Sequence, residues 1–330
     1  MTTLEIYASL LAGSWALLLA DVVIICVFFD GFSDLFTNKA SEALLVSPVP
    51  GTISVNDLSH WLLVYLFQLP WLIYAFVCLF RKYKGQAFCI SAPVIPKRIF
   101  LLFSISSFLH YVWMICVDRQ HFIPATVVML VSSVLLFTCV AISLNALNVI
   151  GPDLLFDGYF RDIQMVRMFG QNLIGVFATW SNIVGLVELS IILHYNLGVP
   201  QPSATLIVQV VLLLEILVIF TVDVFLLQHH SRFFLALYLR TAVDTMYCII
   251  RERDAYGEVT ATRFTIFIVA FGMFTTKAAI IVRLYCKGGK SAVEPLTHHI
   301  LERKDLNESM ESFPISGATP SNTRSYQSFS

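Results

Sequence analysis

Charged side chains are scarce in this sequence of 330 residues, where Asp, Glu, Lys and Arg together make up only 13%. An ordinary soluble domain contains about 25% of these residues. Hydrophobic residues make up 57% of the chain, and the mean hydropathy is +0.77. This composition excludes a soluble enzyme, a disordered chain and a secreted disulfide scaffold. It predicts a multi-pass membrane protein that is embedded in a lipid bilayer.

Several functional signatures are also missing. The 21 basic and 22 acidic residues give a net charge of −1, which provides no electrostatic footprint for nucleic acid. The chain has no nucleophile–base pair, no glycine-rich phosphate loop and no histidine or cysteine spacing typical of zinc. We therefore predict no enzymatic activity, no cofactor and no metal site. The seven cysteines do not pair in the predicted outer loops, so no structural disulfide is predicted either.

Long apolar stretches are what the sequence does contain. Eight of them reach the roughly 20 residues that a helix needs to cross the hydrocarbon core. The predicted fold is therefore an all-α bundle of about eight transmembrane helices. The stretches are residues 5–29, 58–80, 98–117, 122–146, 167–195, 204–228, 232–251 and 263–286. The seventh is the weakest prediction, because it is short and contains Arg240 and Asp244.

Basic residues in the short loops set the predicted orientation. The loop between the second and third stretches contains five bases and no acid, which predicts that it faces the cytoplasm; the bases are Arg81, Lys82, Lys84, Lys97 and Arg98. An even number of crossings then places both termini in the cytosol. Residues 287–330 are rich in small and polar residues toward their end, which predicts a disordered cytoplasmic tail.

Ionisable residues inside the predicted spans are costly to bury and therefore informative. They are Asp21, Glu188, Glu215, Asp223, Arg240, Asp244 and Lys277. Arg240 and Asp244 are four residues apart, so they can neutralise each other on one helix face. Lys277 then needs another acid, and Glu215 is the nearest in depth. One interpretation is an ion or proton path through the last three helices. The other, which the balance of acids and bases favours, is a set of interhelical ion pairs that fixes the packing.

Small residues recur at spacings of three and four along the fifth stretch, at Gly175, Ala178, Asn182 and Gly185. Such a stripe usually allows a neighbouring helix to approach closely. Beside Phe177 and Trp180, it would also leave room for a flat hydrophobic molecule.

Three short motifs resemble the TspO family of translocator and tryptophan-rich sensory proteins. Residues 110–113 read His-Tyr-Val-Trp and resemble the family's Asn-Trp-Ala-Trp stretch. Residues 177–182 read Phe-Ala-Thr-Trp-Ser-Asn, which is similar to the Phe-Ala-Thr followed by Asn of the family's fifth helix. Trp61 and Tyr65 resemble its Trp-x-x-x-Tyr. Over residues 5–195 the chain is similar to an extended, invertebrate-type branch that adds helices after the fifth.

This resemblance implies a TspO-like five-helix bundle at residues 1–195, followed by three additional transmembrane helices at 196–286. It also implies a site for a tetrapyrrole or a sterol, lined by Trp61, Tyr65, His110, Trp113, Phe177, Trp180 and Asn182. The chain departs from the family where His110 replaces an asparagine, and where no Lys or Arg follows Tyr195 to complete the sterol motif.

The main functional prediction is therefore a membrane protein that binds a flat hydrophobic ligand. A transporter or channel that uses the buried charges at Glu215, Arg240, Asp244 and Lys277 is the first alternative. A seven-helix receptor is the second, suggested by the Asp-Arg-Gln triplet at residues 118–120. The predicted topology places that triplet outside, which disfavours contact with a G protein.

Overall fold

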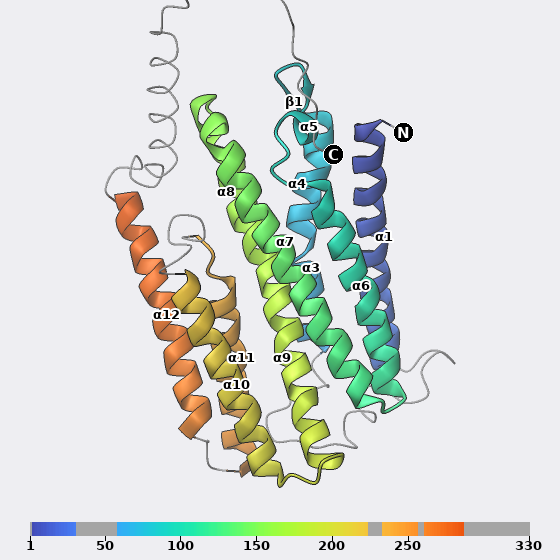
Figure 1. The fold of residues 1–330 in the computed structure, drawn as a ribbon, viewed down its shortest axis with the longest axis vertical. Helices are drawn as coiled ribbons and strands as arrows, with labels where there is room; N and C mark the ends of the chain where they lie inside the picture. Colours follow the sequence, from blue (N-terminus) through green and yellow to red (C-terminus); the bar gives the residue numbers. More distant parts are fainter. Residues whose placement is uncertain (1, 31–57, 224–232, 257–260, 287–330) are drawn as a thin grey trace, which may run out of the picture.

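Long helices that lie side by side form almost all of the described structure (Figure 1). The computed structural model describes residues 2–30, 58–223, 233–256 and 261–286. The predicted outer loop at residues 31–57 and the predicted tail at 287–330 lie outside these ranges. Seven helical segments of the described part are long and apolar enough to cross a membrane. The prediction of an all-α, multi-pass membrane bundle is confirmed at this level.

The helices of the first half are α1 (Thr3–Asp30), α3 (Leu58–Leu66), α4 (Leu69–Phe80), α5 (Phe88–Ser91) and α6 (Lys97–Asp118). Those of the second half are α7 (Phe122–Phe156), α8 (Phe160–Met165), the π-helical η1 (Val166–Gln171), α9 (Asn172–Tyr195), α10 (Gln201–Thr221), α11 (Ala236–Tyr256) and α12 (Ala261–Cys286). We call α1 to α9 the N-terminal unit and α10 to α12 the C-terminal unit.

The basic loop after α4 forms a two-stranded antiparallel hairpin. Strand β1 (Lys82–Tyr83) pairs with β2 (Gln86–Ala87). The two residues between them, Lys84 and Gly85, have φ angles of 50° and 83°, the left-handed conformation that a tight hairpin turn requires. The hairpin lies at the end of the bundle where α1 begins and α12 ends (Figure 1).

The second predicted span is interrupted, because α3 ends at Leu66 and α4 begins at Leu69. Pro70 lies in the first turn of α4, where its missing N–H costs no helical hydrogen bond. At the break, the Gln68 side chain donates to the carbonyl oxygen of Leu173 on α9 at 3.0 Å. The two short helices are thus separate segments of one span, and the break is anchored to α9.

The predicted end of the fourth span and the predicted start of the fifth both differ from the structure. Helix α7 was predicted to end at residue 146 but continues through Pro152 to Phe156. The fifth span begins at Phe160 rather than at residue 167, and α8, η1 and α9 follow one another without a break. Hydropathy missed the first turns of this span because Arg161, Asp162 and Arg167 lower the local average.

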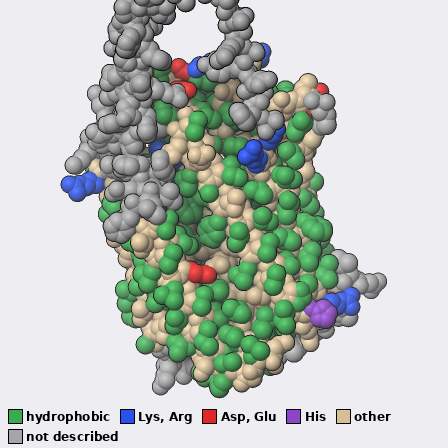
Figure 2. Space-filling view, in the orientation of Figure 1, with side chains coloured by type: hydrophobic (Ala, Val, Ile, Leu, Met, Phe, Trp, Pro, Cys, Tyr) green, Lys and Arg blue, Asp and Glu red, His purple; other side chains and the backbone are tan. Residues whose placement is uncertain are grey.

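Helix α9 is central to the bundle. It contacts α3, α7, α10 and α11, and the span that contains it is far more buried than the span of α12. The outward face of the bundle is rich in large hydrophobic side chains (Figure 2). An apolar surface of this extent is expected where lipid chains surround a protein.

Helix α11 is the most polar of the long helices and is not among the seven apolar segments. It nevertheless packs against α9 and α12 along the bundle (Figure 1).

Candidate functional site

Six of the seven residues that the resemblance implied form one aromatic cluster inside the N-terminal unit. Helices α3, α6 and α9 each contribute two of them, three or four residues apart and hence on one helix face. Every one of the six is at most 4% exposed. The aromatic cluster consists of Trp61, Tyr65, His110, Trp113, Phe177 and Trp180.

The rings of the aromatic cluster are packed directly against one another. Trp61 stacks on Trp113 with 5.1 Å between ring centroids and 17° between planes. His110 stacks on Phe177 at 4.8 Å, also at 17°. Tyr65 meets the Phe177 ring edge to face at 5.2 Å. A flat ligand bound here would therefore separate two of these rings rather than enter a preformed slot.

The polar atoms of the cluster are only partly satisfied. His110 Nε2 lies 3.1 Å from Ser181 Oγ, and Trp113 Nε1 donates to a carboxylate oxygen of Glu188 on α9. In contrast, Tyr65 Oη, His110 Nδ1 and Trp180 Nε1 are buried and have no hydrogen-bond partner among the described residues. Buried polar groups are nearly always hydrogen-bonded, so three orphaned atoms within one cluster set it apart from an ordinary packed core.

Asn182, the seventh implied residue, does not join the cluster. Its side chain points across the boundary between the two units and donates from Nδ2 to Glu215 Oε2 on α10 at 2.7 Å. The small-residue stripe on α9 likewise faces neighbouring protein. A Cβ atom at Gly175 would lie 2.3 Å from Phe234 Cε2, and one at Gly185 would lie 3.0 Å from Leu130 Cδ2.

The buried charges of the C-terminal unit pair differently from the prediction in one respect. Arg240 and Asp244 form the expected pair, with Nε 2.7 Å from Oδ2. Lys277, however, pairs with Asp223 and not with Glu215. Lys277 Nζ also donates to the carbonyl oxygen of Phe234 at 2.9 Å.

Side-chain reach explains this correction. Asp223 follows Glu215 by eight residues, about 12 Å along a helix. The long lysine side chain can direct its ammonium group toward the end of a span, where a charge is less costly. At that end Tyr238 Oη donates to Asp223 at 2.8 Å and completes the polar group. Glu215 instead faces α9, where Asn182 is its partner.

Sequence reasoning missed a second polar group, at the end of the bundle that carries the hairpin. Arg81 pairs with Asp162 on α8, and Tyr74 Oη donates to the same carboxylate at 2.9 Å. From the sequence, Arg81 is predicted only to be one of the basic residues of a cytoplasmic loop. Asp162 lies before the predicted start of the fifth span at residue 167. The available signal was an acid five residues before the predicted span that begins at Arg167.

Comparison with protein-family models, curated proteins and solved structures finds no match to this chain. The TspO-like character of the first five spans therefore stays a prediction from the motifs. Among the described residues, no group of three His, Cys, Asp or Glu side chains is placed to hold a metal ion.

Proposed function

We propose that this multi-pass membrane protein binds a flat hydrophobic ligand with a polar edge at the aromatic cluster of α3, α6 and α9. The observation that carries the proposal is the coincidence of stacked rings with the three orphaned polar atoms of Tyr65, His110 and Trp180. Stacked rings favour a planar guest, and unsatisfied donors and acceptors favour one that carries heteroatoms.

The broken second span supports a route for opening the cluster. Helix α3 carries Trp61 and Tyr65, and the break at Gln68 separates it from α4. A short segment joined to the bundle at a break can shift without moving α4. We infer that α3 moves as a flap, which separates Trp61 from Trp113 when the ligand binds.

A tetrapyrrole or a sterol is the ligand class that the motif resemblance implies. A tetrapyrrole fits the geometry better, because its conjugated plane can stack between indole and imidazole rings while its nitrogen or carboxylate groups meet the orphaned atoms. A sterol offers one hydroxyl group, which could satisfy one of the three atoms.

The proposal is tested by titrating the purified protein with protoporphyrin, followed through the absorbance of the ligand, with a sterol as competitor. Trp180→Phe keeps most of the packing but removes the indole N–H and part of the stacking surface. It should weaken binding about fivefold, the equivalent of about 1 kcal/mol. Tyr65→Phe, which removes one orphaned hydroxyl, should weaken it less. Trp15→Phe on α1, outside the cluster, is the matched control. Equal affinities in all four proteins would refute the proposed site.

The position of the basic hairpin loop supports a proposal for the orientation. It lies at the same end as the start of α1 and the end of α12 (Figure 1). We propose that this end faces the cytoplasm, in accordance with the positive-inside rule, and that α11 is an eighth crossing shielded by α9 and α12.

A second candidate function is ion or proton transport through the C-terminal unit. The observation that favours it is Glu215, which lies within an apolar span and has no basic partner among the described residues. It predicts that Glu215→Gln changes flux in liposomes that contain the purified protein. Unchanged flux, or none in the parent protein, would leave the ion pairs of this unit as packing elements.

A further inference from the structure

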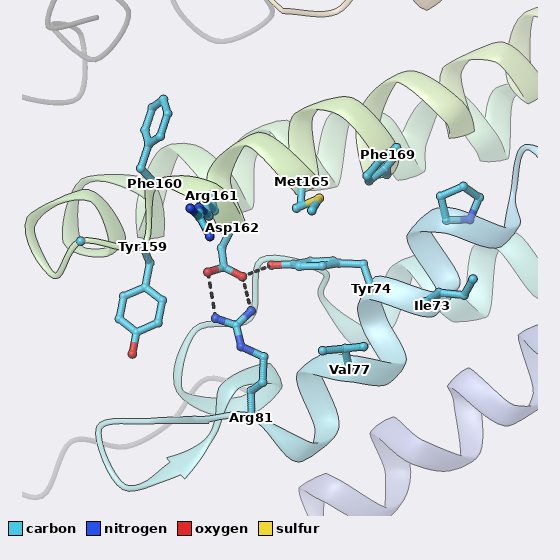
Figure 3. Close-up of a pocket in the computed structure, with 12 residues that line it drawn as sticks. Ile73, Tyr74, Val77, Arg81, Tyr159, Phe160, Arg161, Asp162, Met165 and Phe169 are labelled. Carbon is cyan, nitrogen blue, oxygen red and sulfur yellow. Dashed lines mark hydrogen bonds and ion pairs between the residues drawn. The ribbon is translucent and has the colours of Figure 1, made fainter.

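A pocket of about 890 Å³ opens between α4 and the α8–η1 segment (Figure 3). It is separate from the aromatic cluster, since none of that cluster's residues lines it. The span that contains α4 ends at Phe80, and the span that contains α8 begins at Phe160. Arg81 and Tyr159, which also line the pocket, lie just outside these two spans. It therefore extends from the hydrocarbon region to the membrane surface.

The part of the pocket inside the spans is apolar and open at the side. Ile73 and Val77 on α4 face Met165 and Phe169 across the groove (Figure 3). Ile73 is 51% exposed, and Val77 and Met165 are each 43% exposed. In a membrane, a groove open in this way is continuous with the surrounding lipid chains. An acyl chain can thus lie in it without the protein opening.

The part at the membrane surface is polar and carries two arginines. Both terminal nitrogens of Arg81 bind the two carboxylate oxygens of Asp162, and the second contact is 3.0 Å long. This bidentate pairing raises the pKa of Arg81 above its ordinary value and holds the guanidinium in place. Arg161 lies beside the pair and forms no ion pair with a described residue (Figure 3).

The charge of this end of the bundle is positive. Residues 81–98 and 153–162 together contain six basic and three acidic side chains. Asp162, one of the three acids, is only 6% exposed and already bound to Arg81, so it adds little repulsion toward an incoming anion. The exposed charge that faces the pocket mouth is that of Arg161.

We propose that this pocket is a binding site for an anionic phospholipid, whose phosphate contacts Arg161 and the outer edge of Arg81 while one acyl chain lies along Ile73, Val77, Met165 and Phe169. Basic pockets between transmembrane helices at the cytoplasmic surface are suited to anionic lipid headgroups. The apolar wall of the groove favours this occupant over a free phosphate, and the exposed charge of Arg161 favours it over a neutral sterol.

The test measures lipid binding to the detergent-purified, full-length protein by native mass spectrometry. The ligands are phosphatidylglycerol, phosphatidylcholine with the same acyl chains, and glycerol phosphate as the headgroup without chains. The variants are Arg161→Gln, which removes the exposed charge, and Met165→Trp, which fills the apolar groove. Arg98→Gln is the matched control, because Arg98 is an exposed arginine at the same end of the bundle that does not line the pocket.

The wild-type protein should prefer phosphatidylglycerol over phosphatidylcholine. Arg161→Gln should weaken phosphatidylglycerol binding about tenfold, as expected for one charge-assisted contact, and abolish the preference. Met165→Trp should weaken binding of both lipids, and Arg98→Gln should leave both unchanged.

Equal binding of the two lipids by the wild type, or equal losses in Arg161→Gln and Arg98→Gln, would overturn the proposal. Binding of glycerol phosphate as tight as that of the lipid would show a phosphate site instead. The Met165→Trp result stands independently if Arg161→Gln does not fold.

Discussion

The N-terminal and C-terminal units bury polar groups inside an apolar bundle in different ways. Apart from the Arg81–Asp162 pair at the end of the bundle, the N-terminal unit pairs many buried hydroxyl groups. Ser106 contacts Ser132 at 2.6 Å, and Ser133 donates to the carbonyl oxygen of Ala178 at 3.0 Å. The C-terminal unit relies on two buried ion pairs, Lys277 with Asp223 and Arg240 with Asp244. A hydroxyl group that loses its partner costs about one hydrogen bond, whereas a buried charge that loses its partner costs several times more. The stability of the C-terminal unit therefore depends more strongly on single side chains than that of the N-terminal unit.

The largest expected effect comes from Lys277→Met. The substitution removes the ammonium group that neutralises the buried Asp223 carboxylate, and breaking a buried pair in this way costs about 3–5 kcal/mol. We expect a loss of that size in the free energy of unfolding, measured by denaturant titration in detergent.

Two further variants sharpen this comparison between the units. Ser132→Ala in the N-terminal unit should cost only about 1 kcal/mol. The double substitution Lys277→Met, Asp223→Asn should recover a large part of the loss, because it also removes the negative charge that Lys277 neutralises. If Lys277→Met and Ser132→Ala cost the same, the proposed difference between the units is wrong.

An intermediate effect is expected at the boundary of the two units, where α9 meets the segment that precedes α11. A Cβ atom added at Gly175 would lie 2.3 Å from Phe234 Cε2 and 3.1 Å from Ala236 Cβ. Phe234 is 7% exposed, so its ring has little room to move away. Gly175→Ala should therefore lower the free energy of unfolding by about 1–3 kcal/mol through overpacking.

The control for this substitution is Gly13→Ala on α1, where no atom lies within 4 Å of the added Cβ. Alanine is the better helix former by up to about 1 kcal/mol, so this variant should be neutral or slightly more stable. A loss at Gly13 as large as that at Gly175 would show that helical glycine itself, and not the close approach of the two units, sets the stability.

Local patterns predicted most of the long helices and which members of the aromatic cluster share a helix face. The pairs Trp61 with Tyr65, His110 with Trp113, and Phe177 with Trp180 each have a spacing of three or four, so each pair had to share one helix face. That the three faces meet came from the motif resemblance. The spacing places Asn182 on the small-residue stripe of α9 with Gly175 and Gly185, but spacing does not specify which neighbour that face meets.

Contacts that depend on side-chain reach and on span ends could not be derived in the same way. Matching residues by depth paired Lys277 with Glu215, because depth along the backbone ignores the length of a lysine side chain. The pair of Arg81 with Asp162 joins residues 81 positions apart and needs the relative placement of α4 and α8. Hydropathy could not supply this, since Asp162 itself lowers the apolar average that defines the start of the span.

The smallest expected effect concerns a surface contact that only the N-terminal unit has, between the hairpin and the end of α7. Tyr83 Oη and Lys84 Nζ both contact the Asp157 carboxylate, the lysine at 3.2 Å, and these hydrogen bonds lower the pKa of Asp157. Because the folded-state pKa is lowered, the stabilisation is present above the unfolded value of about 3.9 and is lost as the pH falls through the folded value. Wild-type protein should therefore lose slightly more thermal stability below about pH 4 than Asp157→Asn does.

The control is Asp153→Asn, which removes an exposed carboxylate one turn earlier in α7 and should follow the wild-type pH dependence. If Asp157→Asn also follows the wild type at every pH, the hairpin is held by its backbone and by the packing of Tyr83 against Tyr159 at 5.2 Å, and the charged contact contributes nothing.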